Sequence, residues 1–389
     1  MVLFCKTRPV RRSIIRNDPP HIGDRSNGGI QMTIPFERTK NPKQKPARAA
    51  DIPFGHILSD HLFQMRCNDE AGWHDAAIRP YADLRLSPAA TCLHYGQEVF
   101  EGLKAYRRQD GRIHLFRTAD HLRRMNRSAN RLAMPQFDED LVRDALHRLV
   151  RIEESWIPSE NGTSLYIRPN YIGTGSTLGV RRASEYLFYI VCGPAGAYYR
   201  NGLQPVRILI EETYTRAAKG GMGAAKTGGN YAASLAAGAE ACRQGCDQVL
   251  WLDAAERLYV QEAGSMNIMF VLNDRLVTPP LTCGTILAGI TRDSVLQLAR
   301  DRNIPVDERD VTVDELTDAA HTGALTEAFG TGTAAVISPI GSFVRNGQTI
   351  PVSDGRPGPV TRMFYDTLTG IQYGRIPDPY GWTDPLTEP

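Results

Sequence analysis

The segment that decides the fold and the chemistry of this 389-residue chain is Ala224-Ala225-Lys226-Thr227-Gly228-Gly229-Asn230-Tyr231. It places a lysine and a phenol five residues apart among small residues. A lysine that forms a Schiff base must lose its proton, which burial favours, and glycines would let a flat cofactor approach the backbone. Because most single lysines are solvated surface groups, this segment alone leaves a surface residue as an open alternative.

Size and composition are those of an ordinary globular protein with room for two hydrophobic cores. The chain is 42% hydrophobic and 23% charged with a formal net charge of +2, so nothing in its composition indicates nucleic-acid binding. No apolar run approaches the roughly 20 residues that a membrane helix needs. We therefore expect neither nucleic acid nor a membrane as a partner.

Seven cysteines are scattered along the chain, and this odd number does not indicate a disulfide framework. A reducing cytoplasmic location fits this pattern. Cys242 and Cys246 could face one side of a helix, but no His/Cys cluster accompanies them. We interpret both as packing residues and expect no metal site.

The first 50 residues differ from the rest, because five basic residues precede any acidic one: Lys6, Arg8, Arg11, Arg12 and Arg16. A transit peptide would need an amphipathic pattern and a secretory signal an apolar core, and both are missing. We interpret residues 1–50 as a disordered basic extension or an over-extended gene start, with Met32 as the alternative initiator.

The remaining chain is expected to form two domains. Glycine and proline accumulate over 193–205, which we take as a linker between a smaller domain at 51–192 and a larger one at 206–389. The larger domain carries the lysine segment. Strands and helices are mixed without strict alternation, so the fold class is α+β, or mixed α/β, rather than a barrel.

Hydrophobic periodicity predicts the main elements. In the first domain we expect strands at 112–116, 164–168 and 186–192 and helices at 119–132 and 139–154. In the second we expect a strand at 206–210, a helix at 231–244, adjacent strands over 248–252 and 258–272, and helices at 291–300, after Thr312 and after Pro359. Thr312 and Glu315 have capping-box spacing.

Three further segments of the second half are typical of a cofactor site. Glu262 lies in an apolar strand, where it is either exposed on a polar face or buried against a cation or N–H partner such as a protonated pyridine. The loop at 287–293 places glycine before a helix, where free N–H groups can bind an anion. The turn at 329–334 could hold a carboxylate or phosphate. Together with Lys226, these are the groups that pyridoxal phosphate requires.

The chain resembles the branched-chain amino-acid aminotransferases, which are fold-type IV pyridoxal-phosphate enzymes. The resemblance runs from about residue 54 to Trp382, and its most specific segments lie at 93–105, 165–169, 224–231, 262–267, 289–292 and 332–334. It implies a homodimer that transfers an amino group between L-leucine, L-isoleucine or L-valine and 2-oxoglutarate, giving the 2-oxo acid and L-glutamate.

The resemblance also implies roles for residues that would bind pyridoxal 5′-phosphate. Lys226 would carry the cofactor covalently and then shuttle the substrate proton. Glu262 would pair with the pyridine nitrogen and Tyr231 with the phenolic oxygen of the ring. The remaining residues expected around the cofactor, mostly at its phosphate, are Arg124, Asn267, Ile290, Thr291, Thr331 and Thr333.

Substrate roles follow from the same resemblance. Tyr95, with the backbone of Thr333 and Ala334, would hold the substrate α-carboxylate. Arg168 would pair with the distal carboxylate of glutamate. Aromatic walls of the side-chain pocket are expected from Phe100, Tyr166 and Tyr198, whose alternative interpretation is core packing.

The chain departs from the family pattern at several positions. Ala288 replaces a frequent proline before the phosphate-binding glycine. Ala335 and Ser338 replace a redox cysteine pair of some animal relatives. Asn170 and the segment 174–177 differ near the expected substrate entrance, which leaves open an unusual aromatic or β-branched amino donor. A D-amino-acid transaminase, an aminodeoxychorismate lyase and a non-catalytic cofactor-binding protein are the further alternatives.

Overall fold

The computed structural model of the chain describes residues 34–48, 52–198 and 203–386, all of which belong to one compact unit. Residues 1–33, which hold most of the expected basic extension, lie outside the described part. Residues 34–48 are paired with the folded body, since Phe36 forms a parallel bridge with Ile78 and the Thr39 N–H donates to His61 Nε2 at 2.9 Å. The folded body therefore begins before residue 51.

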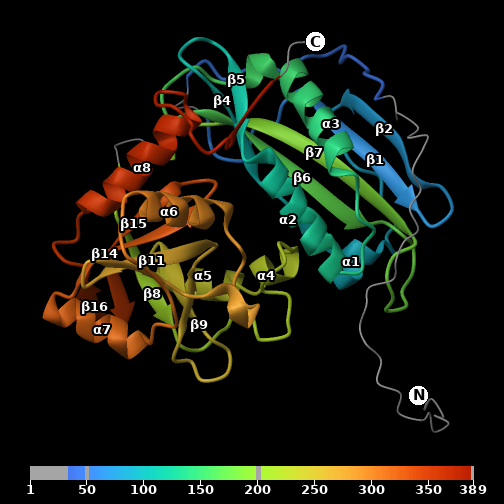
Figure 1. Cartoon of the computed structure of the whole chain (residues 1–389). Coiled ribbons are helices and arrows are strands. Elements are labelled where there is room, and N and C mark those ends of the chain that lie inside the picture. Colours follow the sequence, from blue (N-terminus) through green and yellow to red (C-terminus); the bar gives the residue numbers. More distant parts are fainter. Residues whose placement is uncertain (1–33, 49–51, 199–202, 387–389) are drawn as a thin grey trace, which may run out of the picture. The chain divides into compact units, whose positions relative to one another are not determined.

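The first sheet is antiparallel and collects the N-terminal half of the chain (Figure 1). Its strands follow the order β17-β5-β4-β6-β7-β1-β2, with β3 added on β6. They are β1 (His61–Asn68), β2 (Gly72–Pro80), β3 (Glu98–Phe100), β4 (Leu103–Arg107), β5 (Ile113–Phe116), β6 (Ser164–Gly173), β7 (Glu185–Ala195) and β17 (Thr383–Pro385). Helices α2 (Thr118–Arg131) and α3 (Glu139–Ile152) lie along this sheet, and the short α1 (Thr91–Tyr95) lies at its end.

The second sheet belongs to the C-terminal half and follows the order β10-β9-β8-β15-β14-β11-β12-β13, with β16 on β15. Its strands are β8 (Val206–Glu211), β9 (Gln248–Leu252), β10 (Val260–Ala263), β11 (Met266–Leu272), β12 (Arg275–Thr278), β13 (Val306–Glu308), β14 (Leu325–Gly332), β15 (Val336–Arg345) and β16 (Gln348–Pro351). Because β10 also pairs with β11, six of these strands close into a ring. The mixed fold class is confirmed, and the ring closure of this sheet is a feature that the sequence did not indicate.

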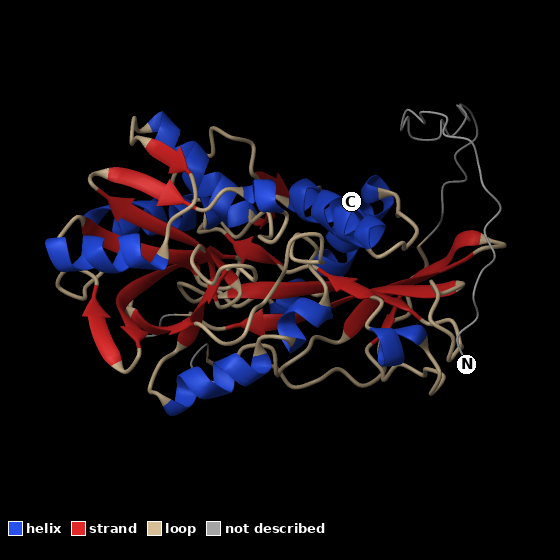
Figure 2. Cartoon of the chain, turned by 90° about the horizontal axis from the view of Figure 1, so that it is seen from below, coloured by secondary structure: helices blue, strands red, loops and turns tan. Residues whose placement is uncertain are grey.

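Both faces of the second sheet are buried, as the arrangement of strands between helices in Figure 2 illustrates. On β11, Ile268 and Phe270 join the cluster that includes α7 (Val313–Thr322). Met269 points the other way, into the cluster with α6 (Ile290–Asp301) and α8 (Pro359–Gln372). This double burial explains why β11 is apolar from Ile268 to Leu272 and lacks the alternation of a half-exposed strand.

Most predicted elements are confirmed within a few residues at each end, including α2, α3, α6, α7 and α8. The expected helix at 231–244 is instead two helices, α4 (Gly228–Ala232) and α5 (Leu235–Arg243). Ser234 Oγ donates to the Tyr231 carbonyl at 2.6 Å, which competes with the helical hydrogen bonds at the break. Cys246 is buried beyond the end of α5 while Cys242 is exposed, so the two thiols do not share one helical face.

Two of the predicted strands also have different bounds in the structure. The stretch 258–272 folds as the hairpin β10–β11 around Gly264, whose φ of +57° suits glycine. The strand expected at 164–168 continues to Gly173, because the Pro169 carbonyl accepts the Glu101 N–H at 2.9 Å although the proline donates nothing.

The expected domain boundaries remain a prediction. Strand β7 continues to Ala195, so three residues of the expected linker lie in a strand, and residues 199–202 lie outside the described part. At the other end of the chain, β17 pairs with β5 of the first sheet. The C-terminal segment therefore contributes to the sheet formed by the N-terminal half.

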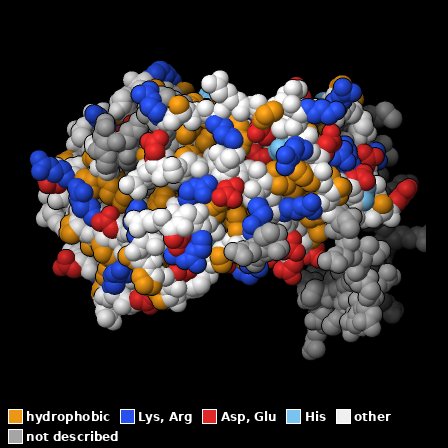
Figure 3. Space-filling view, turned by 90° about the horizontal axis from the view of Figure 1, so that it is seen from above, with side chains coloured by type: hydrophobic (Ala, Val, Ile, Leu, Met, Phe, Trp, Pro, Cys, Tyr) orange, Lys and Arg blue, Asp and Glu red, His pale blue; other side chains and the backbone are white. Residues whose placement is uncertain are grey.

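Helices of the described part are too short and too polar to cross a membrane. The same residues contain no group of His, Cys, Asp and Glu side chains that could hold a metal ion. On the face drawn in Figure 3, basic and acidic side chains are interspersed.

Candidate functional site

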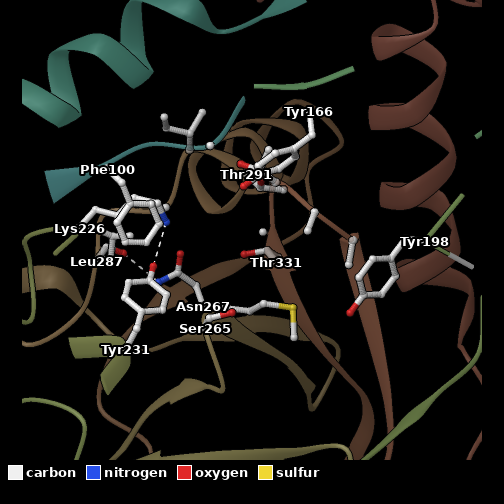
Figure 4. A pocket seen from close by; sticks show the side chains of 18 of the residues that line it. Phe100, Tyr166, Tyr198, Lys226, Tyr231, Ser265, Asn267, Leu287, Thr291 and Thr331 are labelled. Carbon is white, nitrogen blue, oxygen red and sulfur yellow. Dashed lines mark hydrogen bonds between the residues drawn. The ribbon is translucent and has the colours of Figure 1, made fainter. Parts of the chain in front are cut away.

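A cavity of about 220 Å³ lies where residues of both sheets meet. The first sheet and α2 supply one wall, and the second wall comes from α4, β11, the start of α6 and the turn between β14 and β15. Thirteen of the fifteen candidate residues named from the sequence line this cavity: Phe100, Arg124, Tyr166, Arg168, Tyr198, Lys226, Tyr231, Asn267, Ile290, Thr291, Thr331, Thr333 and Ala334. Figure 4 shows the labelled side chains gathered around one space.

Lys226 lies two residues before α4, with its amine facing two aromatic rings. Its Nζ donates to the Tyr231 hydroxyl at 2.9 Å and lies 4.9 Å from the centre of the Phe100 ring (Figure 4). The backbone on either side is fixed, because Lys226 N–H donates to Ser128 Oγ and Phe100 N–H donates to the Lys226 carbonyl. The lysine is therefore held at the junction of the two sheets with its amine in the cavity.

The glycine after Thr227 has a different function from the one expected. A Cβ on Gly228 would lie 2.0 Å from Glu98 Oε1, the oxygen that accepts the Gly228 N–H. Burial raises the pKa of Glu98, and the Gly228 N–H partly offsets this. Gly228 is thus required by close contact with the half-buried carboxyl group of Glu98 in β3, whereas a cofactor approaching the backbone was the reason expected from the sequence.

Glu262 is buried, which excludes the interpretation as an exposed strand residue. Its Oε2 forms an ion pair with Arg216 Nε at 2.8 Å, and its Oε1 accepts hydrogen bonds from Asn267 Nδ2 at 3.0 Å and Leu287 N–H at 3.3 Å. Burial raises the pKa of Glu262, and the positive charge of Arg216 offsets part of that rise. The carboxyl group lies behind the main cavity, beside a smaller one that shares Tyr231 and Leu287.

Arg216 was not anticipated from the sequence. It lies ten residues before Lys226 in a segment without regular structure, so neither periodicity nor a motif indicated it. The only signal in the sequence was that a buried Glu262 would need a cationic or N–H partner. That requirement does not show whether the partner is a protein side chain or a ligand.

The other end of the cavity is suited to an anion. Helix α6 begins after Gly289, and no side chain caps its first turn, so the helix N-terminus presents free N–H groups near Ile290 and Thr291. Thr331 Oγ1 is buried without a hydrogen-bond partner among the described residues. A buried hydroxyl without a partner is costly, and a phosphate oxygen in the cavity would satisfy it.

Arg124 faces the same end and is held from behind. Its Nε and one terminal nitrogen donate to the two oxygens of Glu101 at 2.6 and 2.8 Å, and the other terminal nitrogen donates to the Ala288 carbonyl at 3.1 Å. A guanidinium has five N–H groups, so two remain for a ligand. Burial opposes ionisation of Glu101, but Arg124 and then His121 hold the pKa of that carboxyl well below its usual range.

The substrate side of the cavity combines a cation with aromatic rings. Arg168 lies over the Phe100 ring at 4.8 Å and donates to the Tyr166 hydroxyl at 3.2 Å, while its buried Nε has no partner among the described residues. Phe54, which the sequence analysis did not include, packs edge-on against Tyr166 with ring centres 4.8 Å apart. Tyr198 lines the opposite side (Figure 4).

The turn between β14 and β15 presents backbone donors to the cavity. In the described part of the chain, the N–H groups of Thr333, Ala334 and Ala335 have no hydrogen-bond acceptor, although all three residues line the cavity. Unpaired N–H groups in a concave turn are a suitable site for a carboxylate.

Tyr95 lies apart from the other residues expected at the substrate carboxylate, and its role there stays a prediction. It ends α1, is exposed, and donates its hydroxyl to the Leu178 carbonyl, so it does not line the cavity of its own chain. Helix α1 ends before Gly96, which adopts a left-handed conformation. The chain reverses there and continues into β3, whose Phe100 lines the cavity. Asn170 also does not line the cavity, although it pairs with Phe100.

The comparisons with known proteins agree with this geometry. A family model described as amino-transferase class IV matches residues 98–343. Branched-chain-amino-acid transaminase 1 of Bacillus subtilis (strain 168) is 50% identical over 355 residues, covering 91% of this chain and 99% of the relative.

Solved structures are similar over most of the chain. A branched-chain amino acid aminotransferase from Escherichia coli has a TM-score of 0.68 and 30% identity, covering 85% of this chain and 99% of that one. The branched-chain amino acid aminotransferase of Thermobaculum terrenum, solved in its PLP form, has a TM-score of 0.68 and 28% identity, with coverages of 85% and 99%.

Proposed function

The chain belongs to the amino-transferase class IV family, and on that premise we propose that it transaminates branched-chain L-amino acids with 2-oxoglutarate. The observation that carries the proposal is the position of Lys226, whose amine contacts Tyr231 in the cavity. The buried Glu262 lies on one side of this pair and an anion site lies at the other end. Its cofactor is pyridoxal 5′-phosphate, which when bound supplies an electron sink for negative charge at the substrate Cα.

The residues present fit this cofactor. The unpartnered Thr331 hydroxyl, the two spare N–H groups of Arg124 and the start of α6 would hold the phosphate. Tyr231 would hydrogen-bond the phenolic oxygen of the ring, and Glu262, ionised with the help of Arg216, would keep the pyridine nitrogen protonated. Asn267 would hold Glu262 in place, since it donates to that carboxylate at 3.0 Å.

Lys226 would have two functions in turn. It would carry the cofactor covalently, and after the substrate amine replaces it, the free amine would take the proton from the substrate Cα and deliver it to C4′ of the cofactor. The Phe100 and Tyr231 rings lie beside the amine, with their centres 4.9 and 5.4 Å from Nζ, and hold it inside the cavity.

The substrate would bind with its α-carboxylate on the N–H groups of the turn at Thr333 and Ala334. The side chain would then face Phe100, Tyr166 and Tyr198, whose apolar surfaces suit a branched aliphatic chain. Arg168, whose Nε lacks a partner, would pair with the distal carboxylate of 2-oxoglutarate or glutamate. Asn170 lies outside the cavity lining, which weakens the case for an unusual donor.

We also infer a homodimer in the cytoplasm. Exposed large apolar side chains, which a soluble monomer rarely gathers, include Leu93 and Tyr95 at α1 and Leu178 and Val180 in the loop that the Tyr95 hydroxyl contacts. A second copy of the chain would cover this surface.

The proposal is tested by a rate survey of the purified protein with 2-oxoglutarate as acceptor. We expect kcat/KM to be highest for L-leucine, L-isoleucine and L-valine, and lower for aromatic L-amino acids. Faster turnover of D-amino acids, or release of pyruvate from aminodeoxychorismate, would overturn the assignment in favour of the related reactions.

A further inference from the structure

Lys104 is a buried lysine that the reaction as proposed does not use. It lies in the middle of β4, beside Tyr166 of β6, and is only 9% exposed. Its Nζ donates to the Ala334 carbonyl at 2.7 Å, which joins the first sheet to the turn between β14 and β15. A buried ammonium is costly, so its position calls for a compensating interaction.

No carboxylate compensates it. Among the described residues none forms an ion pair with Lys104, and burial lowers its pKa to about 8. It borders a second cavity of about 250 Å³, which shares Tyr198, Ala334 and Ala335 with the site that contains Lys226. The turn at 333–335 therefore separates a buried positive charge from the proposed substrate site.

The carbonyl contact also orients the turn. A trans peptide group points its C=O and N–H in opposite directions, so binding the Ala334 carbonyl to Lys104 directs the Ala335 N–H away from Lys104. The Thr333 and Ala334 N–H groups of the same turn are the proposed ligands of the substrate α-carboxylate, and the Ala335 N–H is a third donor of this turn without an acceptor among the described residues. Donation to the carbonyl also polarises the peptide group, which makes its N–H a stronger donor.

We propose that Lys104 is a positioning residue for the substrate carboxylate: it fixes the 333–335 turn with its N–H groups toward the cavity and places a positive charge behind them. This inference rests on the proposed function, because it assumes that the turn binds the carboxylate. It does not involve Lys104 in proton transfer, since its amine contacts the turn and does not line the main cavity.

Binding of an unreactive carboxylate tests the inference without requiring turnover. We choose 4-methylvaleric acid, the leucine skeleton without its amino group, and calorimetry of the cofactor-loaded protein. Lys104→Met is expected to weaken this binding about tenfold and to raise the KM for L-leucine similarly, because the turn loses a charge-assisted hydrogen bond. Cofactor content and kcat are expected to change little.

The pH dependence separates a charge effect from a structural one. Wild-type affinity for 4-methylvaleric acid is expected to fall as pH rises through about 8, where Lys104 loses its proton. Lys104→Arg keeps its charge at that pH and is expected to retain the affinity, while Lys104→Met lacks the inflection. The other titratable groups that line the cavity beside Lys104 are Asp366 and Arg375 at its exposed rim and four tyrosines, Tyr106, Tyr198, Tyr365 and Tyr373. Burial raises the pKa of each of these four phenols.

Arg375→Met is the matched control, because it removes an exposed cation from the same cavity without touching the turn. It is expected to leave the binding of 4-methylvaleric acid unchanged. Unaltered binding and KM in Lys104→Met, or equal losses in Lys104→Met and Arg375→Met, would overturn the inference. Failure of the proposed function would look different, since the wild-type protein would then not transaminate L-leucine at all.

Discussion

At the scale of single residues, the site depends on buried charges that are held by other buried charges. Glu262 is held by Arg216, and Arg124 by Glu101, so both of these residues expected to contact the cofactor have a charged partner behind them. Such partners fix the orientation of the contacting group and its protonation state. Their removal should therefore change catalysis while leaving the cavity lined by the same residues.

Arg216→Met should lower kcat/KM for L-leucine roughly tenfold to hundredfold, because a hydrogen-bonded buried charge loses its partner. Without Arg216, the pKa of Glu262, already raised by burial, rises further. A larger fraction of Glu262 would then be protonated, and because that fraction falls as pH rises, the deficit should shrink at higher pH. Steady-state kinetics across pH would measure this.

Arg302→Met is the matched control for that prediction, because Arg302 is exposed at the end of α6 and its side chain donates to Thr367, which does not line the cavity. It should have wild-type kinetics. A deficit of Arg216→Met that is independent of pH would contradict the role assigned to the charge of Glu262.

At the scale of elements, the start of α6 depends on the absence of a side chain at Gly289. Its φ of −69° is open to any residue, but a Cβ there would lie 1.8 Å from Asn267 Oδ1. The glycine thus allows α6 to approach β11, and Asn267 in turn contacts Glu262. The close contact with Asn267, and not the backbone conformation, explains why residue 289 is a glycine.

Gly289→Ala should weaken affinity for pyridoxal 5′-phosphate about tenfold or more, because overpacking costs about 1–3 kcal/mol and displaces Asn267. Titration of the cofactor-free protein, followed by visible absorbance, measures this. Gly238→Ala on α5 is the matched control, since a Cβ there meets nothing within 4 Å and alanine favours the helix by about 1 kcal/mol. Equal cofactor affinity in both variants would refute the contact argument.

Elements with a strong local signal could be predicted from the sequence. Helix α7 begins at the predicted cap, where the Glu315 N–H donates to Thr312 Oγ1 at 3.0 Å. This is one of the two hydrogen bonds of the expected capping box. The second does not form, because the Glu315 carboxylate binds Arg309. The ring closure through β10 and β11 had no local signal, because strand pairing over long separations is not encoded in the periodicity of either strand.

The residues of the site also differ in whether the sequence could predict them. Lys226, Tyr231 and Arg124 belong to segments that could be matched to a family, and the structure brings them to one cavity. Arg216 and Glu101 could not be found, because their importance depends on which charge each faces after folding. Tyr95 was assigned by its motif, yet α1 directs it to the surface, a direction that sequence spacing does not encode.

At the scale of the whole molecule, the C-terminal segment returns to the sheet formed by the N-terminal half of the chain. Asp384 on β17 accepts hydrogen bonds from Arg143 and His147 of α3. Burial opposes ionisation of Asp384, but the hydrogen bonds from His147 and Arg143 hold its pKa well below the usual range. Its stabilising contribution is therefore complete above about pH 4 and is lost as pH falls below that value.

Asp384→Asn should lower the free energy of unfolding by about 1–2 kcal/mol at neutral pH, because the partly buried hydrogen bonds from Arg143 and His147 lose the negative charge of their acceptor. The difference from wild type should narrow as pH falls below about 4, where the wild-type carboxylate also becomes protonated. Thermal or denaturant unfolding at several pH values measures it. Asp318→Asn on the exposed side of α7 should show no such difference, and a deficit independent of pH would contradict the account.

The central claim is that Lys226 carries the cofactor and moves the substrate proton. Its most direct test is Lys226→Ala, with turnover of L-leucine and 2-oxoglutarate and the visible absorbance of the bound cofactor measured together. We predict that the variant binds pyridoxal 5′-phosphate noncovalently, lacks the absorbance of the lysine-linked form and loses at least about 1,000-fold in turnover. Transamination at a rate close to that of the wild-type protein would contradict the claim.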